Sequence, residues 1–242
     1  VLGCRCAVCS STDPRNNRTR CSALLEWSGH KVLIDTATDF RQQALREGIE
    51  QVDSVLYTHA HADHVHGIDD LRTFTLMTGN AIPVYAARGV LDRIQGLFSY
   101  VFSDAEAPGY RPRLQVNEVT ESFQLFGQKV TPIPLVHGPG ESLGYRIGTL
   151  AYVVDCSAIP KSSRELLQGL DVLVIDALRF REHESHFSIA EAIEVAGQLK
   201  VPRTLLTHLT HDIDYQRHSA GLPDGVEFAY DGQSITLPLP RA

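Results

Sequence analysis

Short apolar runs alternate with segments of helical periodicity along the whole chain. Runs such as 52–58 and 172–176 are bounded by polar residues, which is typical of buried strands. In 188–199 apolar residues recur at helical spacing, and Ser188 followed by Glu191 indicates a capped helix start. The predicted strands are 22–27, 31–35, 52–58, 82–86, 116–120, 123–126, 129–136, 143–148, 150–155, 172–176, 204–207, 226–229 and 234–237. The predicted helices are 40–47, 68–77, 89–98, 164–168 and 188–199.

Strands and helices are mixed in both halves of the chain, and no low-complexity linker separates the halves. This pattern predicts an α/β protein with a single domain over 1–242, in which two sheets pack face to face and helices lie outside. The segment 103–113 is rich in proline, glycine and charge. We expect it to be a surface loop that contacts substrate.

Composition excludes several classes of protein. The chain has 22 Lys and Arg residues against 29 Asp and Glu residues, so its formal net charge is −7 with histidine neutral. This balance disfavours nucleic acid as a partner, because phosphate contacts need clustered cations. No apolar run approaches the roughly 20 residues that span a bilayer, and no basic-then-apolar leader opens the chain. We therefore expect a cytoplasmic protein without a membrane partner.

The histidines point to metal chemistry. The chain has 11 of them, and several lie beside aspartates in short clusters. In His59-Ala60-His61-Ala62-Asp63-His64, four ligand-type residues follow the strand 52–58. Alternation along an extended segment sends His59, His61 and Asp63 to one side before a helix begins. Imidazole and carboxylate suit divalent ions such as Zn or Mn, so the motif predicts ligands for two neighbouring ions.

Further ligands are expected at the ends of other strands. His137 follows the run 131–136, Asp155 follows 152–154, and His208 follows 205–207. A carboxylate placed directly after an apolar strand is costly to bury unless it is paired or binds a metal ion. Together with the first cluster these residues supply seven ligands, enough for two ions.

This ligand pattern resembles the metallo-β-lactamase superfamily. The resemblance implies that His59, His61 and His137 hold one ion, that Asp63, His64 and His208 hold the other, and that Asp155 bridges them. It also implies a four-layer αβ/βα sandwich with the two ions in a groove at one edge.

Three cysteines near the start of the chain predict a separate zinc site. Cys4, Cys6 and Cys9 place three thiolates within six residues, and His211 offers an imidazole. Three thiolates and one imidazole make a closed tetrahedral site, which is structural rather than catalytic. A redox pair of Cys6 and Cys9, or disulfides in a secreted protein, are the alternatives. Cys21 and Cys156 have the character of small core residues.

The combination of a dimetal motif with a Cys3His site is similar to the PhnP-type phosphoribosyl cyclic phosphodiesterases. That family has an additional histidine just before a helix, which His186 matches. Its members begin with a strand and a Gly-rich turn before the cysteines. Here the only methionine is Met77 and the chain opens on Val1, so we expect this N-terminal strand to be missing from the sequence.

The resemblance implies a dinuclear metal-dependent hydrolase that acts on small cyclic phosphodiesters. Its cofactors would be two divalent ions, Zn or Mn, in the active site and one structural Zn. Asp63 would orient the attacking water while it binds an ion, and His186 would donate a proton or hydrogen bond to the leaving oxygen. The expected partners are a small-molecule phosphodiester and, as an assembly, a second copy of the chain in a homodimer.

Other functions remain open from the sequence. The same seven ligands would serve a thioester or lactone hydrolase, and a similar zinc-bearing relative acts as a non-catalytic accessory in pyrroloquinoline-quinone biosynthesis. A tRNA-processing nuclease of the superfamily needs a flexible basic arm, which this acidic chain does not show. A redox diiron relative carries a carboxylate where this chain has His61, which argues against that class.

Overall fold

The structure is a computed structural model that describes residues 1–103 and 111–238. The chain divides into two compact units: unit 1 comprises Val1–Thr19 and Gln128–Ala242, and unit 2 comprises Arg20–Gly127. Each unit is built on its own sheet, and the α/β class predicted from the sequence is confirmed. The single domain over 1–242 stays a prediction.

Unit 2 is built on a sheet whose strands lie in the order β1-β2-β3-β4-β5. β1 and β2 pair antiparallel, and β2, β3, β4 and β5 pair parallel. The strands of this sheet are β1 (Ala23–Trp27), β2 (His30–Ile34), β3 (Ser54–Leu56), β4 (Ile82–Ala86) and β5 (Leu114–Glu118). Unit 2 also contains β6 (Phe123–Leu125), which is not part of this sheet. Its helices are α1 (Phe40–Glu47), α2 (Ala62–Val65), η2 (Ile68–Leu71), α3 (Arg72–Thr78) and α4 (Arg88–Leu97).

The core of unit 2 forms between this sheet and its helices. All three residues of β3 are buried, as expected for a parallel strand covered on both faces. Val55 of β3 packs in one cluster with Phe40, at the start of α1, and with Leu91 of α4. Helix α1 ends at Gly48, whose left-handed conformation (φ 62°) closes the last turn.

Unit 1 is built on a sheet with strands in the order β12-β11-β10-β9-β8-β7. β7, β8 and β9 pair antiparallel, whereas β9, β10, β11 and β12 pair parallel. Its strands are β7 (Gln128–His137), β8 (Gly140–Ile147), β9 (Leu150–Val153), β10 (Val172–Asp176), β11 (Arg203–Thr207) and β12 (Val226–Phe228). Its helices are η1 (Pro14–Asn16), α5 (Lys161–Leu166), α6 (Ile189–Leu199) and α7 (Tyr215–Ser219). The carboxyl ends of β7, β9, β10 and β11 therefore meet at one edge of this sheet.

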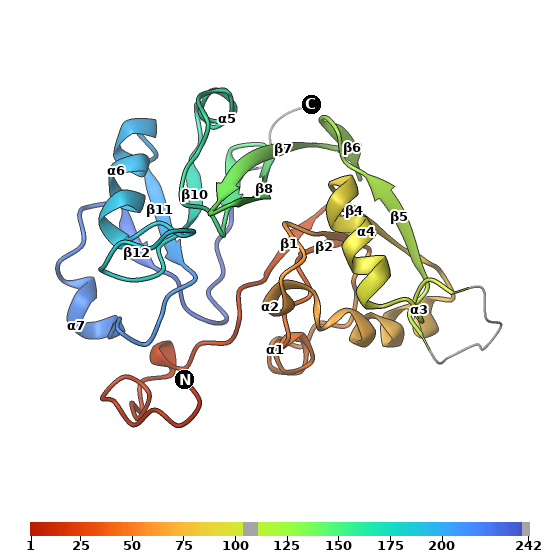
Figure 1. Ribbon diagram of the computed structural model, residues 1–242, viewed down its shortest axis with the longest axis horizontal. Helices are drawn as coiled ribbons and strands as arrows, with labels where there is room; N and C mark the ends of the chain where they lie inside the picture. The colour runs from red at the N-terminus through yellow and green to blue at the C-terminus, as the bar shows by residue number, and fades with distance from the viewer. Residues whose placement is uncertain (104–110, 239–242) are drawn as a thin grey trace. The chain divides into compact units, whose positions relative to one another are not determined.

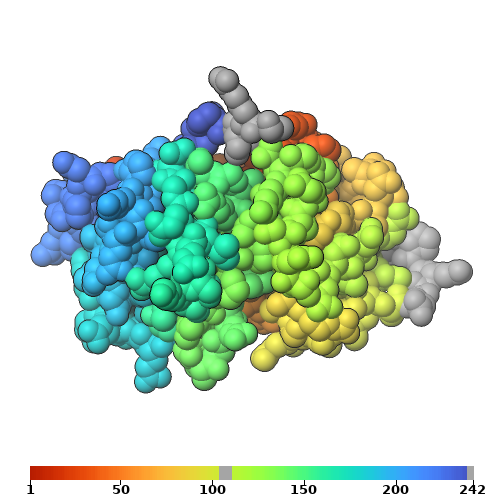
Figure 2. Space-filling model, turned by 90° about the horizontal axis from the view of Figure 1, so that it is seen from above, coloured from red at the N-terminus to blue at the C-terminus, as the bar shows by residue number. Residues whose placement is uncertain are grey.

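Helix α6 covers part of the unit 1 sheet and begins where the sequence predicts. It contacts β10 and β11 (Figure 1) through a buried face that includes Ile189, Val195 and Leu199. Ser188 accepts a hydrogen bond from the Glu191 backbone, and the Glu191 side chain accepts one from the Ser188 backbone. Part of this region of the chain is visible in light blue on the surface seen in Figure 2.

The N-terminal segment of unit 1 lies beside α7 although about 200 positions separate them in the sequence. The Asn16 side chain accepts a hydrogen bond from the Tyr215 backbone at 2.8 Å, and the Arg15 guanidinium lies over the Tyr215 ring at 4.4 Å. These contacts place the early cysteines against the C-terminal part of the unit.

Two sequence predictions concern residues 234–237 and the loop 103–113. The predicted strand 234–237 is wrong: these residues form no strand, and Pro238, which directly follows them, has no N–H to donate to a ladder. Of the predicted surface loop 103–113, residues 104–110 lie outside the described residues. Across the described ranges no helix is long and apolar enough to cross a membrane.

At Gly67, which follows the histidine motif, the chain passes close to the backbone of Thr36 and Ala37. Its N–H donates to the Thr36 carbonyl at 3.0 Å. A Cβ at position 67 would collide with the Ala37 carbonyl and would lie 2.7 Å from Phe40 Cβ. Only glycine, which has no Cβ, fits at position 67 without a shift of these neighbours.

We predict that Gly67→Ala lowers the free energy of unfolding by about 1–3 kcal/mol, because the added methyl must displace backbone atoms. The matched control is Gly96→Ala in α4, where an added Cβ would meet no heavy atom within 4 Å and helix propensity improves. Chemical denaturation measures both. Equal stability of the Gly67 variant and the wild type would contradict the packing described.

Candidate functional site

The histidine motif of unit 2 follows β3 and runs into α2. His61 occupies the N-cap position of α2 with an extended backbone (φ −72°, ψ 152°). The motif therefore turns from extended chain to helix between His61 and Asp63. The His59 ring lies 4.5 Å from the His61 ring and 4.3 Å from the His64 ring, measured between centroids. His64 Nε2 lies 3.6 Å from an Asp63 oxygen. The four predicted ligands of this motif are thus brought together within unit 2.

A buried aspartate that the sequence analysis did not assign orients this motif. Asp35 follows β2, which pairs parallel with β3, and its side chain is completely buried. Its carboxylate accepts hydrogen bonds from the Thr58 N–H at 2.8 Å, the Thr58 hydroxyl at 2.7 Å and His64 Nδ1 at 2.7 Å. Because the Thr58 hydroxyl hydrogen goes to Asp35, the hydroxyl oxygen accepts from His59 Nδ1 at 3.0 Å.

These contacts define the tautomers of two predicted metal ligands. His59 and His64 are both protonated on Nδ1, so Nε2 of each ring carries the lone pair that a metal ion would bind. A single carboxylate, Asp35, acts on His64 directly and on His59 through Thr58. In metalloproteins, histidine ligands are commonly oriented by a carboxylate in this way.

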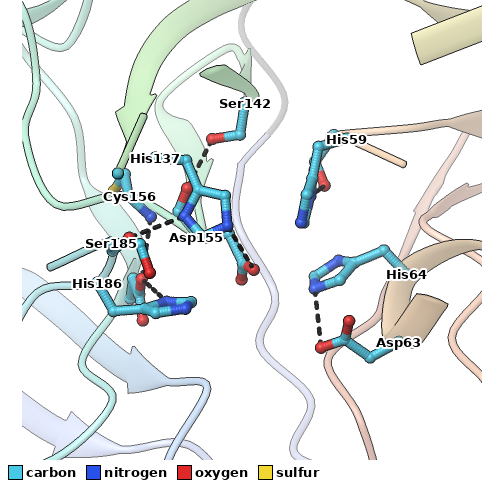
Figure 3. A network of polar contacts seen from close by, with 12 residues as sticks. His59, Asp63, His64, His137, Ser142, Asp155, Cys156, Ser185 and His186 are labelled. Atoms are coloured by element: carbon cyan, nitrogen blue, oxygen red, sulfur yellow. Dashed lines mark hydrogen bonds and ion pairs between the residues drawn. The ribbon is translucent and has the colours of Figure 1, made fainter. Parts of the chain in front are cut away.

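The predicted metal ligands of unit 1 lie at the edge where its parallel strands end. His137 ends β7, Asp155 follows β9 and His208 follows β11. One Asp155 oxygen lies 3.2 Å from His208 Nε2, and the other lies 3.8 Å from His137 Nε2. His137 Nδ1 donates to the Ser185 carbonyl at 2.8 Å, so its Nε2 also carries the lone pair (Figure 3). Asp155 thus presents one oxygen to each of two imidazoles.

A second buried aspartate, Asp176 at the end of β10, orients His186. His186 Nδ1 donates to the Asp176 carboxylate at 2.8 Å, and the Cys156 N–H donates to the same oxygen at 3.0 Å. The other oxygen lies 4.0 Å from His208 Nδ1. The His186 and His208 rings stack with 4.8 Å between centroids and 16° between planes. Burial raises the pKa of the Asp176 carboxyl, while the hydrogen bond from His186 opposes that rise.

The buried donors of unit 1 fit a divalent ion. Asp155 and His208 have ligand atoms within 4.8 Å of each other, and the His186 ring stacks on His208 beside them. Asp155 is only 2% exposed, and a carboxylate this deeply buried is costly without a cation nearby. Imidazole nitrogen with carboxylate oxygen is the donor chemistry of Zn and Mn sites.

The predicted zinc ligands come together within unit 1. His211 Nδ1 lies 3.3 Å from Cys4 Sγ, 3.6 Å from Cys6 Sγ and 3.4 Å from Cys9 Sγ. Tetrahedral zinc with ordinary bond lengths would separate sulfur and nitrogen ligands by about 3.5 Å, so the geometry fits. A hydrogen bond from the Cys9 backbone lowers the pKa of the Cys6 thiol to about 6, which favours the thiolate that binds zinc.

None of the five cysteines, all of which lie in described residues, forms a disulfide in the structure. Cys156 is completely buried, and burial raises the pKa of its thiol well above the ordinary value. Cys156 therefore has the expected character of a small core residue, whereas Cys21 is half-buried.

Sequence reasoning missed Asp35 and Asp176 as functional residues. Both stand at the end of an apolar run, as Asp155 does. That signal led to Asp155 and could have led to the other two. What distinguishes their role is the neighbouring histidine, which only the three-dimensional structure reveals.

Comparison with known proteins gives four informative similarities. Residues 30–209 match the family model of the beta-lactamase superfamily domain. A crystal structure described as a new diphosphatase from the PhnP family is 40% identical, with a TM-score of 0.91, and the match covers 98% of this chain and 92% of that one. An octanoyltransferase of Porphyromonas gingivalis is 42% identical over 236 residues. A ribonuclease Z of Methanopyrus kandleri is 29% identical over 249 residues, covering 84% of this chain and 85% of that protein.

The extent of these matches differs. The octanoyltransferase match covers 96% of this chain but 47% of that protein. The chain therefore spans about half the length of this curated relative.

We predict that Asp35→Asn weakens metal binding about 10–100-fold, because an amide N–H would face the donors of Thr58 and His64. Titration of metal-free protein with Zn²⁺ or Mn²⁺ measures the affinity. The control is Asp53→Asn, which alters a carboxylate of the same unit that accepts from the Lys31 backbone. Unchanged metal affinity in the Asp35 variant would refute the orienting role.

We predict that Cys6→Ser removes about one tightly held ion per chain and lowers the melting temperature, because structural zinc contributes directly to folding. Metal analysis and thermal denaturation are the measurements, and Cys21→Ser is the control. A Cys6 variant that is as stable as the wild type but inactive would indicate a redox or catalytic thiol instead.

Proposed function

The chain belongs to the metallo-β-lactamase superfamily of metal-dependent hydrolases, and from this we propose that it hydrolyses small phosphoric diesters. The superfamily fold predicted from the sequence is confirmed by the family match and by the 40% identical structure. The substrate class is our proposal. It is supported by the similarity to a protein described as a diphosphatase from the PhnP family and by the histidine that Asp176 orients beside the metal ligands.

We propose that the seven predicted ligands hold two divalent ions. His59, His61 and His137 would bind one ion, Asp63, His64 and His208 would bind the other, and Asp155 would bridge them. Within unit 2, Asp35 orients the lone pairs of His59 and His64. Within unit 1, Asp155 presents separate oxygens to His137 and His208. Cys4, Cys6, Cys9 and His211 would hold a third, structural Zn.

The bound ions would supply a water of lowered pKa and would neutralise charge on the phosphoryl oxygens. The second oxygen of Asp63 would accept a hydrogen bond from the attacking water and so orient it. Nε2 of His186 would donate a proton or a hydrogen bond to the leaving oxygen. Asp176 holds the Nδ1 proton of this ring, so protonation at Nε2 gives an imidazolium whose positive charge the Asp176 carboxylate stabilises.

The single observation that carries the proposal is the Asp176–His186 pair. A general acid must lie beside the reacting centre and must have a fixed orientation. The His186 ring stacks on His208 and lies edge-on to His137, at 4.9 Å between centroids. These are two of the proposed metal ligands. Hydrolysis of a diester with an alkoxide leaving group needs a proton donor at this position.

A thioester or lactone hydrolase is the second candidate. One observation favours it: the 42% identity to a protein named octanoyltransferase, a name that implies acyl chemistry. The match covers 47% of that protein. Acyl chemistry is therefore a second proposal for this chain and not a property taken from the relative. Nucleic acid is a poor substrate for a chain with net charge −7.

We predict that His186→Ala lowers kcat on a 2′,3′-cyclic nucleotide about 10²–10⁴-fold with unchanged metal content, because the alkoxide then leaves without a proton. On bis-p-nitrophenyl phosphate the loss is smaller, since p-nitrophenolate leaves without one. Asp176→Asn gives a partial loss that is not additive with His186→Ala.

Steady-state kinetics of the metal-loaded protein on both esters, a thioester and a lactone tests the proposal. His30→Ala, which changes a histidine stacked on Phe126, is the control. Turnover of the thioester or lactone in preference to the phosphodiesters would reject the proposal in favour of the second candidate. Unchanged turnover of the cyclic nucleotide by His186→Ala would reject the role of His186.

A further inference from the structure

Three side chains with rings gather at the surface of unit 2, next to the histidine motif. His66, which directly follows α2, is exposed. In the turn that follows α4, Phe98 is half-buried and Tyr100 is 47% exposed. We call these three side chains the Phe98 patch. The metal-ligand set includes none of them.

Helix α2 places His66 beside Asp63, a proposed metal ligand. The His66 N–H donates to the Ala62 carbonyl at 3.1 Å, so the helical turn continues to position 66. Residues three apart on a helix lie on the same side, with about 5–6 Å between their Cβ atoms. The side chain of Asp63 is 40% exposed. The exposed side of α2 thus leads from a metal ligand to the Phe98 patch.

Phe98 contacts His66 and is held there by its own backbone. The two ring centroids are 5.6 Å apart with 90° between planes, which is an edge-to-face contact. The Phe98 N–H donates to the Ile94 carbonyl at 2.9 Å, and the Phe98 carbonyl accepts from the Val101 N–H at 2.8 Å. Val101 is 1% exposed and anchors the turn in the core. The Phe98 ring is therefore fixed in place although it is only half-buried.

Tyr100 makes a second contact between this turn and the segment after the motif. Its hydroxyl donates to the Asp69 carboxylate at 2.9 Å, and Asp69 lies three residues beyond His66. Partial burial and the hydrogen bond to Asp69 raise the pKa of Tyr100 to about 12. The phenol therefore keeps its proton at neutral pH and continues to donate. The two contacts hold both aromatic rings against the segment that follows the metal motif.

The chemistry of the Phe98 patch favours an uncharged aromatic ligand. The charged groups that act on Tyr100, or on the nearby carboxyl of Asp70, are two acids and two arginines: Asp69, Asp70, Arg41 and Arg72. These charges balance, so no net charge draws an ion to the patch. An aromatic ring gains from edge-to-face or stacked contacts with other rings, in addition to the apolar area that it buries.

We propose that the Phe98 patch binds an aromatic ring carried by the ester group of the substrate. The inference rests on the proposed function and narrows its substrate class to phosphoric diesters with an aryl or nucleobase group. An ester group that extends from the Asp63 side of α2 would place its ring against Phe98 and Tyr100. The patch acts on binding and on the choice of substrate, and it takes no part in bond breaking.

The occupant is assigned as part of the substrate, and not as a second copy of the chain, because the patch is continuous with the metal motif. His66 belongs to the same helical turn as Asp63, and Phe98 contacts His66 directly. A ligand held at the motif therefore lies next to these rings.

Two ligands that differ only in the ester group test the assignment: phenyl phosphate and methyl phosphate, titrated by calorimetry into the metal-loaded full chain. The wild type should bind phenyl phosphate about tenfold more tightly than methyl phosphate. Phe98→Leu keeps an apolar side chain and removes the ring, so it should reduce this preference about threefold or more without changing the affinity for methyl phosphate. Phe98→Tyr, which keeps the ring, should preserve the preference. Leu45→Ala, at a 69% exposed position on α1, is the control and should change neither affinity.

The outcomes separate this inference from the proposed function. No measurable binding of phenyl phosphate, equal affinity of the wild type for the two ligands, or an unchanged preference in Phe98→Leu would overturn the assignment. Equal weakening of both ligands in the folded, metal-loaded variant would indicate a structural role and would also overturn it. Hydrolysis of bis-p-nitrophenyl phosphate by the same preparation tests the proposed function. Absence of this turnover together with the expected preference would reject the hydrolase and would leave the aromatic-ring site in place.

Discussion

A buried carboxylate at the end of a parallel strand orients a histidine in each unit, and the chemistry of the protein depends on this interaction. Asp35 accepts from His64 Nδ1 at 2.7 Å, and Asp176 accepts from His186 Nδ1 at 2.8 Å. Both carboxylates also accept a backbone N–H from a residue two or three positions beyond the end of the neighbouring strand, Thr58 in unit 2 and Cys156 in unit 1. The parallel register places donor and acceptor side by side, so strand pairing decides which imidazole nitrogen is presented outward.

The N-terminal segment contacts the segment that follows His208. His208 has a left-handed backbone (φ 60°) directly after β11, a conformation that a non-glycine residue adopts only when its surroundings impose it. His211 lies three residues further on, within reach of all three thiols. The Arg18 guanidinium donates to the Thr210 carbonyl at 3.2 Å and the Ile213 carbonyl at 2.8 Å. The N-terminal segment thus helps to position His208, a proposed metal ligand that lies about 200 positions away.

Much of the architecture follows from local sequence pattern. The capped start of α6 at Ser188 could be predicted because a capping box needs only residues that are close in sequence. The ligand types at 59–64 and at the ends of β7, β9 and β11 could be predicted for the same reason. Asp35 and Asp176 could not be given roles, because their partners are set by strand register, which the local pattern leaves open. The strand predicted at 234–237 is absent because alternating apolar residues do not by themselves provide a neighbouring strand to pair with.

The proposed assignment of seven ligands to two ions is tested most directly by metal analysis of ligand variants. The wild type should hold about three ions per chain, one of them resistant to chelators. His64→Ala, in unit 2, and His208→Ala, in unit 1, should each cost about one ion, and the double variant should lose no more than either alone. Losses that add in the double variant would show that the two histidines serve different ions and would contradict the account.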